Sequence, residues 1–241
     1  MKIVALLTGR GNNTLKDKNV LSVLGKPVLY YIANSARLCS EFTHWYCSSD
    51  DEKILSVAEN LGYKRIVRPK EYALPTSQHV DAIMHALKVM EDDGLSPDIC
   101  VVLLANNITI KTKWITDCIL KMKNDVSITA VVPVYTSNDH HPLRAKSLND
   151  DGTLSMYEKN ITGKISTNRQ DLPSCYFLAH NFWVLNVDNL KQGNHGQPPW
   201  EFMGNKIIPY EIEESIDIHH KVDLILAKEW IEKNYEDTEY Q

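Results

Sequence analysis

The stretch "DICVVLLA", residues 98–105, decides the fold class. Its apolar run is almost unbroken, whereas a strand with one face in water alternates apolar and polar residues. Such a run is typical of a strand in a parallel sheet that is covered on both faces. Working outward, residues 2–7 have the same character, and residues 43–49, 64–67 and 127–134 are further β-rich segments.

Helical periodicity separates these strands. Apolar positions at helical spacing predict helices over residues 26–38, 50–62, 77–92 and 111–124. Pro27 suits the first turn of the first helix. The alternation of strands and helices over the first 134 residues predicts an α/β fold with a mostly parallel sheet flanked by helices. Ligands of such sheets bind beyond the carboxyl ends of the strands.

After residue 134 the pattern changes. Residues 136–176 are polar and turn-rich, with Asp151-Gly152 as a hairpin signal. We interpret them as an excursion from the sheet within a single domain over residues 1–241. The chain then returns through a predicted strand at 180–187, a strand-like segment at 206–218 and a closing helix at 221–234, and the tail 235–241 is predicted to fray.

Composition narrows the class of protein. The 241 residues are 43% hydrophobic, enough to bury the core of one large domain. A net charge of −5 argues against a nucleic-acid partner. No apolar stretch is long enough to span a membrane, and residues 1–20 show no signal peptide. Five scattered cysteines without a C-x-x-C pair predict reduced thiols in a cytoplasmic protein.

The loop after the first strand points to an anionic ligand. It places Gly9 and Gly11 among three cations, Arg10, Lys16 and Lys18. Glycines let backbone N–H groups approach an anion closely, and phosphate is the natural guest. The loop matches neither G-x-x-x-x-G-K-[ST] nor G-x-G-x-x-G, so a solvated basic turn is the alternative.

Short matches to one family occur in order along nearly the whole chain. They are Gly9-Arg10-Gly11-Asn12-Asn13 with Lys18-Asn19, Gly25-Lys26-Pro27-Val28, Ser48-Ser49-Asp50-Asp51-Glu52-Lys53-Ile54, Arg68-Pro69-Lys70-Glu71-Tyr72-Ala73, "HHP" at 140–142, "NRQDLP" at 168–173 and Ser215-Ile216-Asp217-Ile218-His219. On these residues the sequence resembles the CMP-sialic acid synthetase (acylneuraminate cytidylyltransferase) family. The resemblance implies the α/β nucleotidyltransferase fold, with the excursion at 136–176 serving dimerisation in a homodimer.

The resemblance also implies a reaction and its residues. CTP and a keto-acid sugar would give the CMP-sugar and pyrophosphate, as the anomeric hydroxyl attacks the α-phosphorus. The implied catalytic residues are Arg10, Lys18 and Asp217. The implied nucleotide-binding residues are Gly9, Arg10, Gly11, Asn12, Lys18, Asn19 and Arg68. Asp217 would hold Mg²⁺, and Lys146 and Arg169 would reach the carboxylate of the sugar from the partner subunit.

Several of these residues have structural alternatives. Arg68 could pair with Glu71, and Asp217 could cap a helix. Helix capping explains Asp50-Asp51 as well as chemistry does. His79, His140 and His141 lack the spacing of a metal site and are interpreted as core or solvated histidines.

Three departures from the family pattern cluster around the sugar and the metal. The glycine loop is one residue shorter, and Lys16 could supply its missing charge. Ala105 stands where the family has a glutamine that contacts the sugar. His219 replaces a second aspartate, so His219 could join Asp217 at a metal site that also accepts Mn²⁺. We expect a divergent member acting on a modified nonulosonic acid or a related keto sugar rather than on simple N-acetylneuraminate.

Two other classes of function stay open at this point. One is a nucleotidyltransferase for another base or sugar, such as a Kdo cytidylyltransferase or a guanylyl or thymidylyl enzyme. The other is a sugar-nucleotide binding protein without catalytic activity, in which the altered loop and His219 reflect lost turnover.

Overall fold

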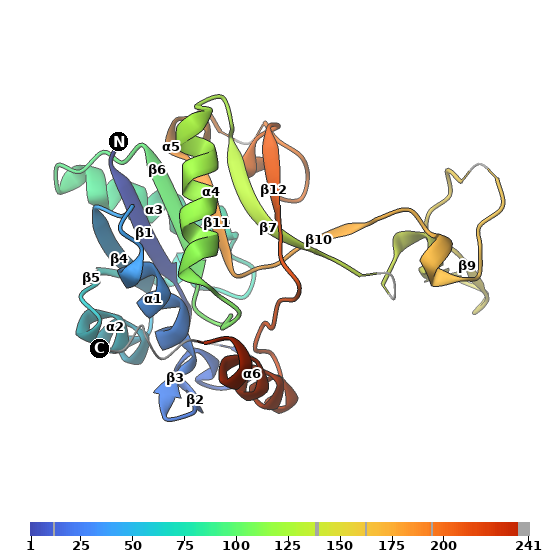
Figure 1. Cartoon of the computed structure of the whole chain (residues 1–241), viewed down its shortest axis with the longest axis horizontal. Coiled ribbons are helices and arrows are strands. Elements are labelled where there is room, and N and C mark those ends of the chain that lie inside the picture. The colour runs from blue at the N-terminus through green and yellow to red at the C-terminus, as the bar shows by residue number, and fades with distance from the viewer. Residues whose placement is uncertain (12, 138–139, 162, 194, 236–241) are drawn as a thin grey trace.

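The structure is a computed structural model that describes residues 1–11, 13–137, 140–161, 163–193 and 195–235 (Figure 1). Its α-helices are α1 (Val28–Leu38), α2 (Glu52–Asn60), α3 (His79–Asp92), α4 (Thr112–Asn124), α5 (Val187–Lys191) and α6 (Lys221–Asn234). Its strands are β1 (Ile3–Thr8), β2 (Ser22–Val23), β3 (Lys26–Pro27), β4 (His44–Ser49), β5 (Lys64–Val67), β6 (Ile99–Leu104), β7 (Ala130–Thr136), β8 (Lys146–Leu148), β9 (Leu154–Met156), β10 (Tyr176–Leu178), β11 (Phe182–Asn186) and β12 (Ile207–Glu211).

The described residues form a central sheet of eight strands. Seven of them follow the order β10-β7-β11-β6-β1-β4-β5, and β12 pairs with β7. The pairs β6–β1, β1–β4, β4–β5 and β12–β7 are parallel. Only β10 and β11 run against their neighbours, β11 lying between β6 and β7. The predicted mostly parallel α/β sheet is therefore confirmed.

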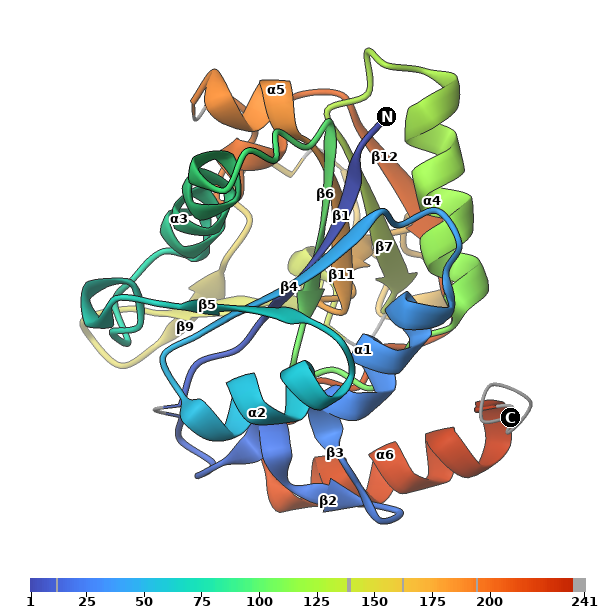
Figure 2. The ribbon, with the colours of Figure 1, turned by 90° about the vertical axis from the view of Figure 1, so that its left-hand side faces the viewer.

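Helices cover both faces of the sheet (Figure 2). Alternate side chains of β1 and β6 face one layer made by α1, α2 and α4, and the side chains between them face α3 and α5. All six residues of β1 and all six of β6 are buried. This double burial explains why both strands are apolar without alternation.

Several boundaries differ from the sequence prediction, and two of these differences have a clear structural context. The first helix begins at Val28, because Lys26 and Pro27 pair with β2 and Pro27 is the N-cap. The strand expected over 206–218 ends at Glu211, and the chain beyond it leads to α6, whose bounds match the prediction. Residues 236–241 of the expected frayed tail lie outside the described residues.

The described residues of the range 137–175, here called the arm, stand away from the sheet between β7 and β10 (Figure 1). The arm carries the antiparallel hairpin β8–β9. Asp151 Oδ1 accepts a hydrogen bond of 3.0 Å from Thr153 N in its turn, and Gly152 has a φ of +80°. The predicted Asp-Gly turn is confirmed. Among all the described residues, no helix is both long enough and apolar enough to cross a membrane.

Candidate active site

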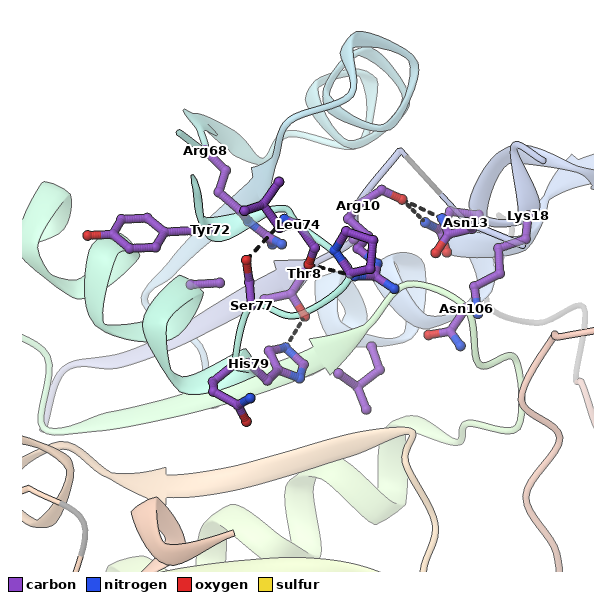
Figure 3. Close-up of a pocket in the computed structure, with 16 residues that line it drawn as sticks. Thr8, Arg10, Asn13, Lys18, Arg68, Tyr72, Leu74, Ser77, His79 and Asn106 are labelled. Carbon is purple, nitrogen blue, oxygen red and sulfur yellow. Dashed lines mark hydrogen bonds between the residues drawn. The ribbon is translucent and has the colours of Figure 1, made fainter. Parts of the chain in front are cut away.

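A cavity of about 310 Å³ opens at the carboxyl ends of β1, β5 and β6, where the fold class places ligands (Figure 3). Among the residues expected to bind nucleotide, its lining contains Gly9, Arg10, Lys18, Asn19 and Arg68. The structure therefore brings together residues that lie up to about 60 positions apart in sequence. Gly11 lies in the same loop, and Asn12 is outside the described residues.

The loop after β1 is held by its neighbours. The carbonyl oxygen of Arg10 accepts hydrogen bonds from Asn13 Nδ2 at 2.5 Å and Asn19 Nδ2 at 3.1 Å. The backbone N–H of Gly11 donates to Asp50 Oδ1 at 3.0 Å. A Cβ on Gly11 would lie 2.6 Å from Asp51 Oδ2, so only glycine fits there. Close packing, rather than a phosphate-loop motif, fixes this turn.

Asp50 and Asp51 have different structural roles. Asp51 caps α2 by accepting a hydrogen bond of 2.7 Å from Lys53 N, as the structural alternative predicted. Asp50 instead fastens the glycine loop through Gly11. Sequence reasoning missed this second role, because nothing in the spacing links Asp50 to a loop 39 residues away.

Three cations surround the cavity. Arg10 Nη1 donates to the Leu74 carbonyl at 2.9 Å. Lys18 is buried, and burial lowers its pKa, while the nearby Asp217 acts in the opposite direction. Arg68 donates through Nε and Nη2 to Ser48 Oγ and to the Ser48 carbonyl, at 3.1 and 2.7 Å. The alternative pairing of Arg68 with Glu71 is therefore wrong. Lys16 is exposed and is not part of the lining.

Asp217 lies beside the cavity through its contact with Asn106. The Asn106 side-chain amide donates to Asp217 Oδ1, and His219 Nε2 lies 2.8 Å from Asp217 Oδ2. The N-cap of α6 is His220, so the interpretation of Asp217 as a helix cap is wrong. Within the described ranges, no group of three or more His, Cys, Asp or Glu side chains could hold a metal ion.

Asn107 joins the strand-end loop to the segment that carries Asp217. It is fully buried, its Oδ1 accepts from Thr109 N at 2.9 Å, and its Nδ2 donates to Ser215 Oγ at 2.8 Å. Sequence reasoning treated 105–108 only as a departure from the family. The available signal was a pair of asparagines directly after a buried strand, where the site of this fold class lies.

The residues expected to bind the sugar lie outside this cavity. Lys146 is on β8 and Arg169 begins the short 3-10 helix Arg169–Asp171, so both are exposed on the arm and outside the cavity lining of their own chain. His141 is structural, because its Nε2 lies 3.0 Å from the Pro173 carbonyl oxygen. His140 is exposed, whereas His79 lines the cavity.

Comparison with known proteins decides the family. The family model described as Cytidylyltransferase matches residues 10–233. The chain belongs to this cytidylyltransferase family. The resemblance noted in the sequence, and the fold it implied, are confirmed.

Curated relatives of this family member carry related names. The chain is 24% identical over 229 residues to an N-acylneuraminate cytidylyltransferase of Escherichia coli. The aligned region covers 94% of the chain and 51% of that protein. The chain is also 24% identical over 185 residues to a pseudaminic acid cytidylyltransferase of Campylobacter jejuni, covering 76% of the chain and 78% of that protein. The chain thus spans about half the length of the first of these relatives and most of the second.

Solved structures show the same fold. A CMP:2-keto-3-deoxy-manno-octonic acid synthetase complexed with CTP has a TM-score of 0.69 at 14% identity, covering 97% of this chain and 99% of that one. A 4-diphosphocytidyl-2C-methyl-D-erythritol synthase from Anaerococcus prevotii has a TM-score of 0.65 at 12% identity, with 96% of each chain covered.

Proposed function

We propose that the chain transfers CMP from CTP to the anomeric hydroxyl of a nonulosonic keto-acid sugar and releases pyrophosphate. The observation that carries the proposal is the family match over residues 10–233 together with a cavity that collects Arg10, Lys18 and Arg68. The relatives named for N-acylneuraminate and pseudaminic acid support the class of sugar.

In the proposed reaction the sugar hydroxyl attacks the α-phosphorus in line, a new P–O bond forms, and the bond to the β-phosphate oxygen breaks. The hydroxyl proton passes to solvent, and pyrophosphate takes the electron pair. Positioning and charge neutralisation dominate such transfers. Arg10 and the buried Lys18 are the groups we assign to the triphosphate, because a cation in a cavity shielded from water stabilises developing charge more strongly than one in water.

The residues beside the cavity fit a magnesium ion brought by the nucleotide. Mg²⁺ in such enzymes takes one or two protein carboxylates and completes its shell with substrate phosphates and water. Asp217 supplies one carboxylate, although Asn106 and His219 now occupy its two oxygens. When bound, the ion would neutralise phosphate charge. A metal-bound His219 would instead favour Mn²⁺, since neutral imidazole suits softer ions than Mg²⁺.

The arm supports a homodimer with shared sites. Its described residues expose large apolar side chains, among them Leu148 at 73% and Leu154 at 67% of their full accessible area. Exposed apolar surface of this kind is typical of an interaction face. We assign Lys146 and Arg169 to the sugar carboxylate of a partner's site, because the arm holds them away from the cavity of their own chain.

The sugar is proposed to differ from simple N-acetylneuraminate. Ala105 offers no polar side chain at a position where the family resemblance places a sugar contact, and it is fully buried against the glycine loop. Asn106 follows Ala105 directly and contacts Asp217, which also contacts His219. The free thiols of all five cysteines agree with the cytoplasm as the proposed compartment.

Pyrophosphate release tests the proposal. The chain is incubated with CTP, UTP, GTP or TTP and with N-acetylneuraminate, a pseudaminate-type sugar or Kdo. We expect release with CTP and a nine-carbon sugar. Release only with Kdo would give the enzyme a different substrate class, and CTP binding without release for any sugar would support a binding protein without turnover.

A further inference from the structure

His79 closes one end of the cavity. It is the first residue of α3, and its Nε2 lies 3.0 Å from Thr8 Oγ1 at the end of β1 (Figure 3). The imidazole also packs on Trp183, with ring centroids 5.1 Å apart at an angle of 60°. The hydrogen bond to Thr8 and the packing on Trp183 therefore fix the orientation of this ring.

The contacts of Thr8 determine which nitrogen of His79 carries the proton. The Thr8 hydroxyl donates its only hydrogen to the Leu103 carbonyl oxygen, 3.2 Å away. With its hydrogen engaged there, the hydroxyl accepts from Nε2–H of His79, and this is the tautomer that we assign from the network. Burial lowers the pKa of His79 to about 3, so the ring is neutral at physiological pH. Nδ1 is then a lone-pair acceptor, and none of the described hydrogen bonds uses it.

The two ends of the cavity differ in charge. Arg10 and Lys18 mark the end suited to phosphate. His79 lies away from Lys18 in Figure 3, and its lining neighbours in sequence, Ser77, Gln78 and Ala82, carry no formal charge, while the Arg68 guanidinium hydrogen-bonds Ser48. A nucleotide laid along this cavity puts its anionic part at the first end and its neutral, planar base at the second.

We propose that Nδ1 of His79 accepts a hydrogen bond from the 4-amino group of cytosine and so selects CTP over UTP. This inference rests on the proposed function only for the nucleotide site. Uracil carries a carbonyl oxygen in place of the amino group, so a lone pair would face a lone pair. A site built around a hydrogen bond discriminates against a substrate that leaves its partner unpaired. We expect a preference for CTP of about 10²-fold in affinity.

Two neutral substitutions separate the two nitrogens of the ring. In His79→Asn the amide oxygen can take the place of Nδ1 but cannot reach Thr8. In His79→Gln the amide can reach Thr8 but offers nothing at Nδ1. The dissociation constants of CTP, UTP and dCTP are measured by calorimetry without sugar. We expect His79→Asn to keep most of the CTP preference and His79→Gln to lose at least tenfold of it.

The substitution Thr8→Val is a second test of the role of Nδ1. It removes the acceptor that holds the proton on Nε2, so Nδ1 can carry the proton instead, and the CTP preference should fall. Thermal unfolding checks that each variant is folded.

Each other outcome has a defined meaning. Equal CTP-to-UTP ratios in the wild type, His79→Asn and His79→Gln would overturn the inference while leaving the proposed function intact. The inference would also be overturned if the His79 variants bound CTP and UTP more weakly by the same factor but bound dCTP as the wild type does. His79 would then contact the 2′-hydroxyl of the ribose and not the base. Failure of the wild type to bind any of the three nucleotides would instead remove the proposed function.

Discussion

The imidazole of His219 contacts the carboxylate of Asp217, with Nε2 lying 2.8 Å from Oδ2. Asn106 donates to the other carboxylate oxygen. Each oxygen of the carboxylate that we assign to the metal thus has one side-chain partner in the free protein. An incoming ion would share these oxygens with Asn106 and His219, displace one of them, or include His219 among its ligands.

Substituting His219→Asp should therefore strengthen the apparent affinity for Mg²⁺, because it replaces an imidazole by the oxygen ligand that Mg²⁺ prefers. The measurement is pyrophosphate release as Mg²⁺ and Mn²⁺ are titrated separately. His220→Asp is the matched control, since it adds the same charge one residue away and retains a good N-cap for α6. An unchanged response to both metals in His219→Asp would place the metal site elsewhere.

Arg10→Ala and Lys18→Ala should each lower kcat by about 10²-fold or more, because each removes a charge from the reacting triphosphate. Lys16→Ala should stay near the wild-type rate, since Lys16 belongs to the same loop but is exposed and outside the lining. Steady-state rates with circular dichroism as a check of folding decide the matter. Equal, small effects of all three substitutions would support the solvated basic turn.

The affinity for CTP should fall at alkaline pH because of Lys18. Burial lowers the pKa of this ammonium group below that of an ordinary lysine, so its charge is lost at a lower pH. Affinity measured from neutral pH to about pH 10 should drop in the wild type but far less in Lys18→Arg, whose side chain stays charged. Over the same range the contribution of Lys18 to the free energy of unfolding rises with pH, because the unfolded chain holds that proton more tightly. A parallel loss of affinity in Lys18→Arg would assign the drop to another group.

Mixing two inactive variants should restore activity if the arm completes a partner's site. Asp217→Ala and Arg169→Ala substitute residues of the cavity side and of the arm, respectively. After subunit exchange, a heterodimer holds one site with both groups intact. We expect partial recovery of pyrophosphate release, together with a dimeric mass by light scattering. Proven exchange without any recovery would count against shared sites.

The two central strands and the closing helix could be predicted from the sequence because burial on both faces and helical periodicity leave a direct mark on residue types. The position of β11 between β6 and β7 could not, since an apolar segment such as 180–187 does not encode which strands it will pair with. Pro27 shows the same limit, because its pairing with Ser22 excludes it from the helix that follows.

Within the site, Arg10, Lys18 and Arg68 could be predicted because they belong to runs with a recognisable order. The roles of Asn106 and His79 could not, since each depends on one contact with a residue distant in sequence, Asp217 and Thr8 respectively. Arg169 belongs to such a run as well, but one chain alone brings neither Arg169 nor Lys146 to the cavity.

The most direct test of the account follows the phosphorus atoms of CTP through the reaction by phosphorus NMR. We expect that, with a nonulosonic acid present, the α-phosphorus signal moves to that of a sugar phosphodiester while the β- and γ-signals merge into that of pyrophosphate. Appearance of CDP and inorganic phosphate, or an unchanged CTP spectrum with every keto-acid sugar supplied, would contradict it.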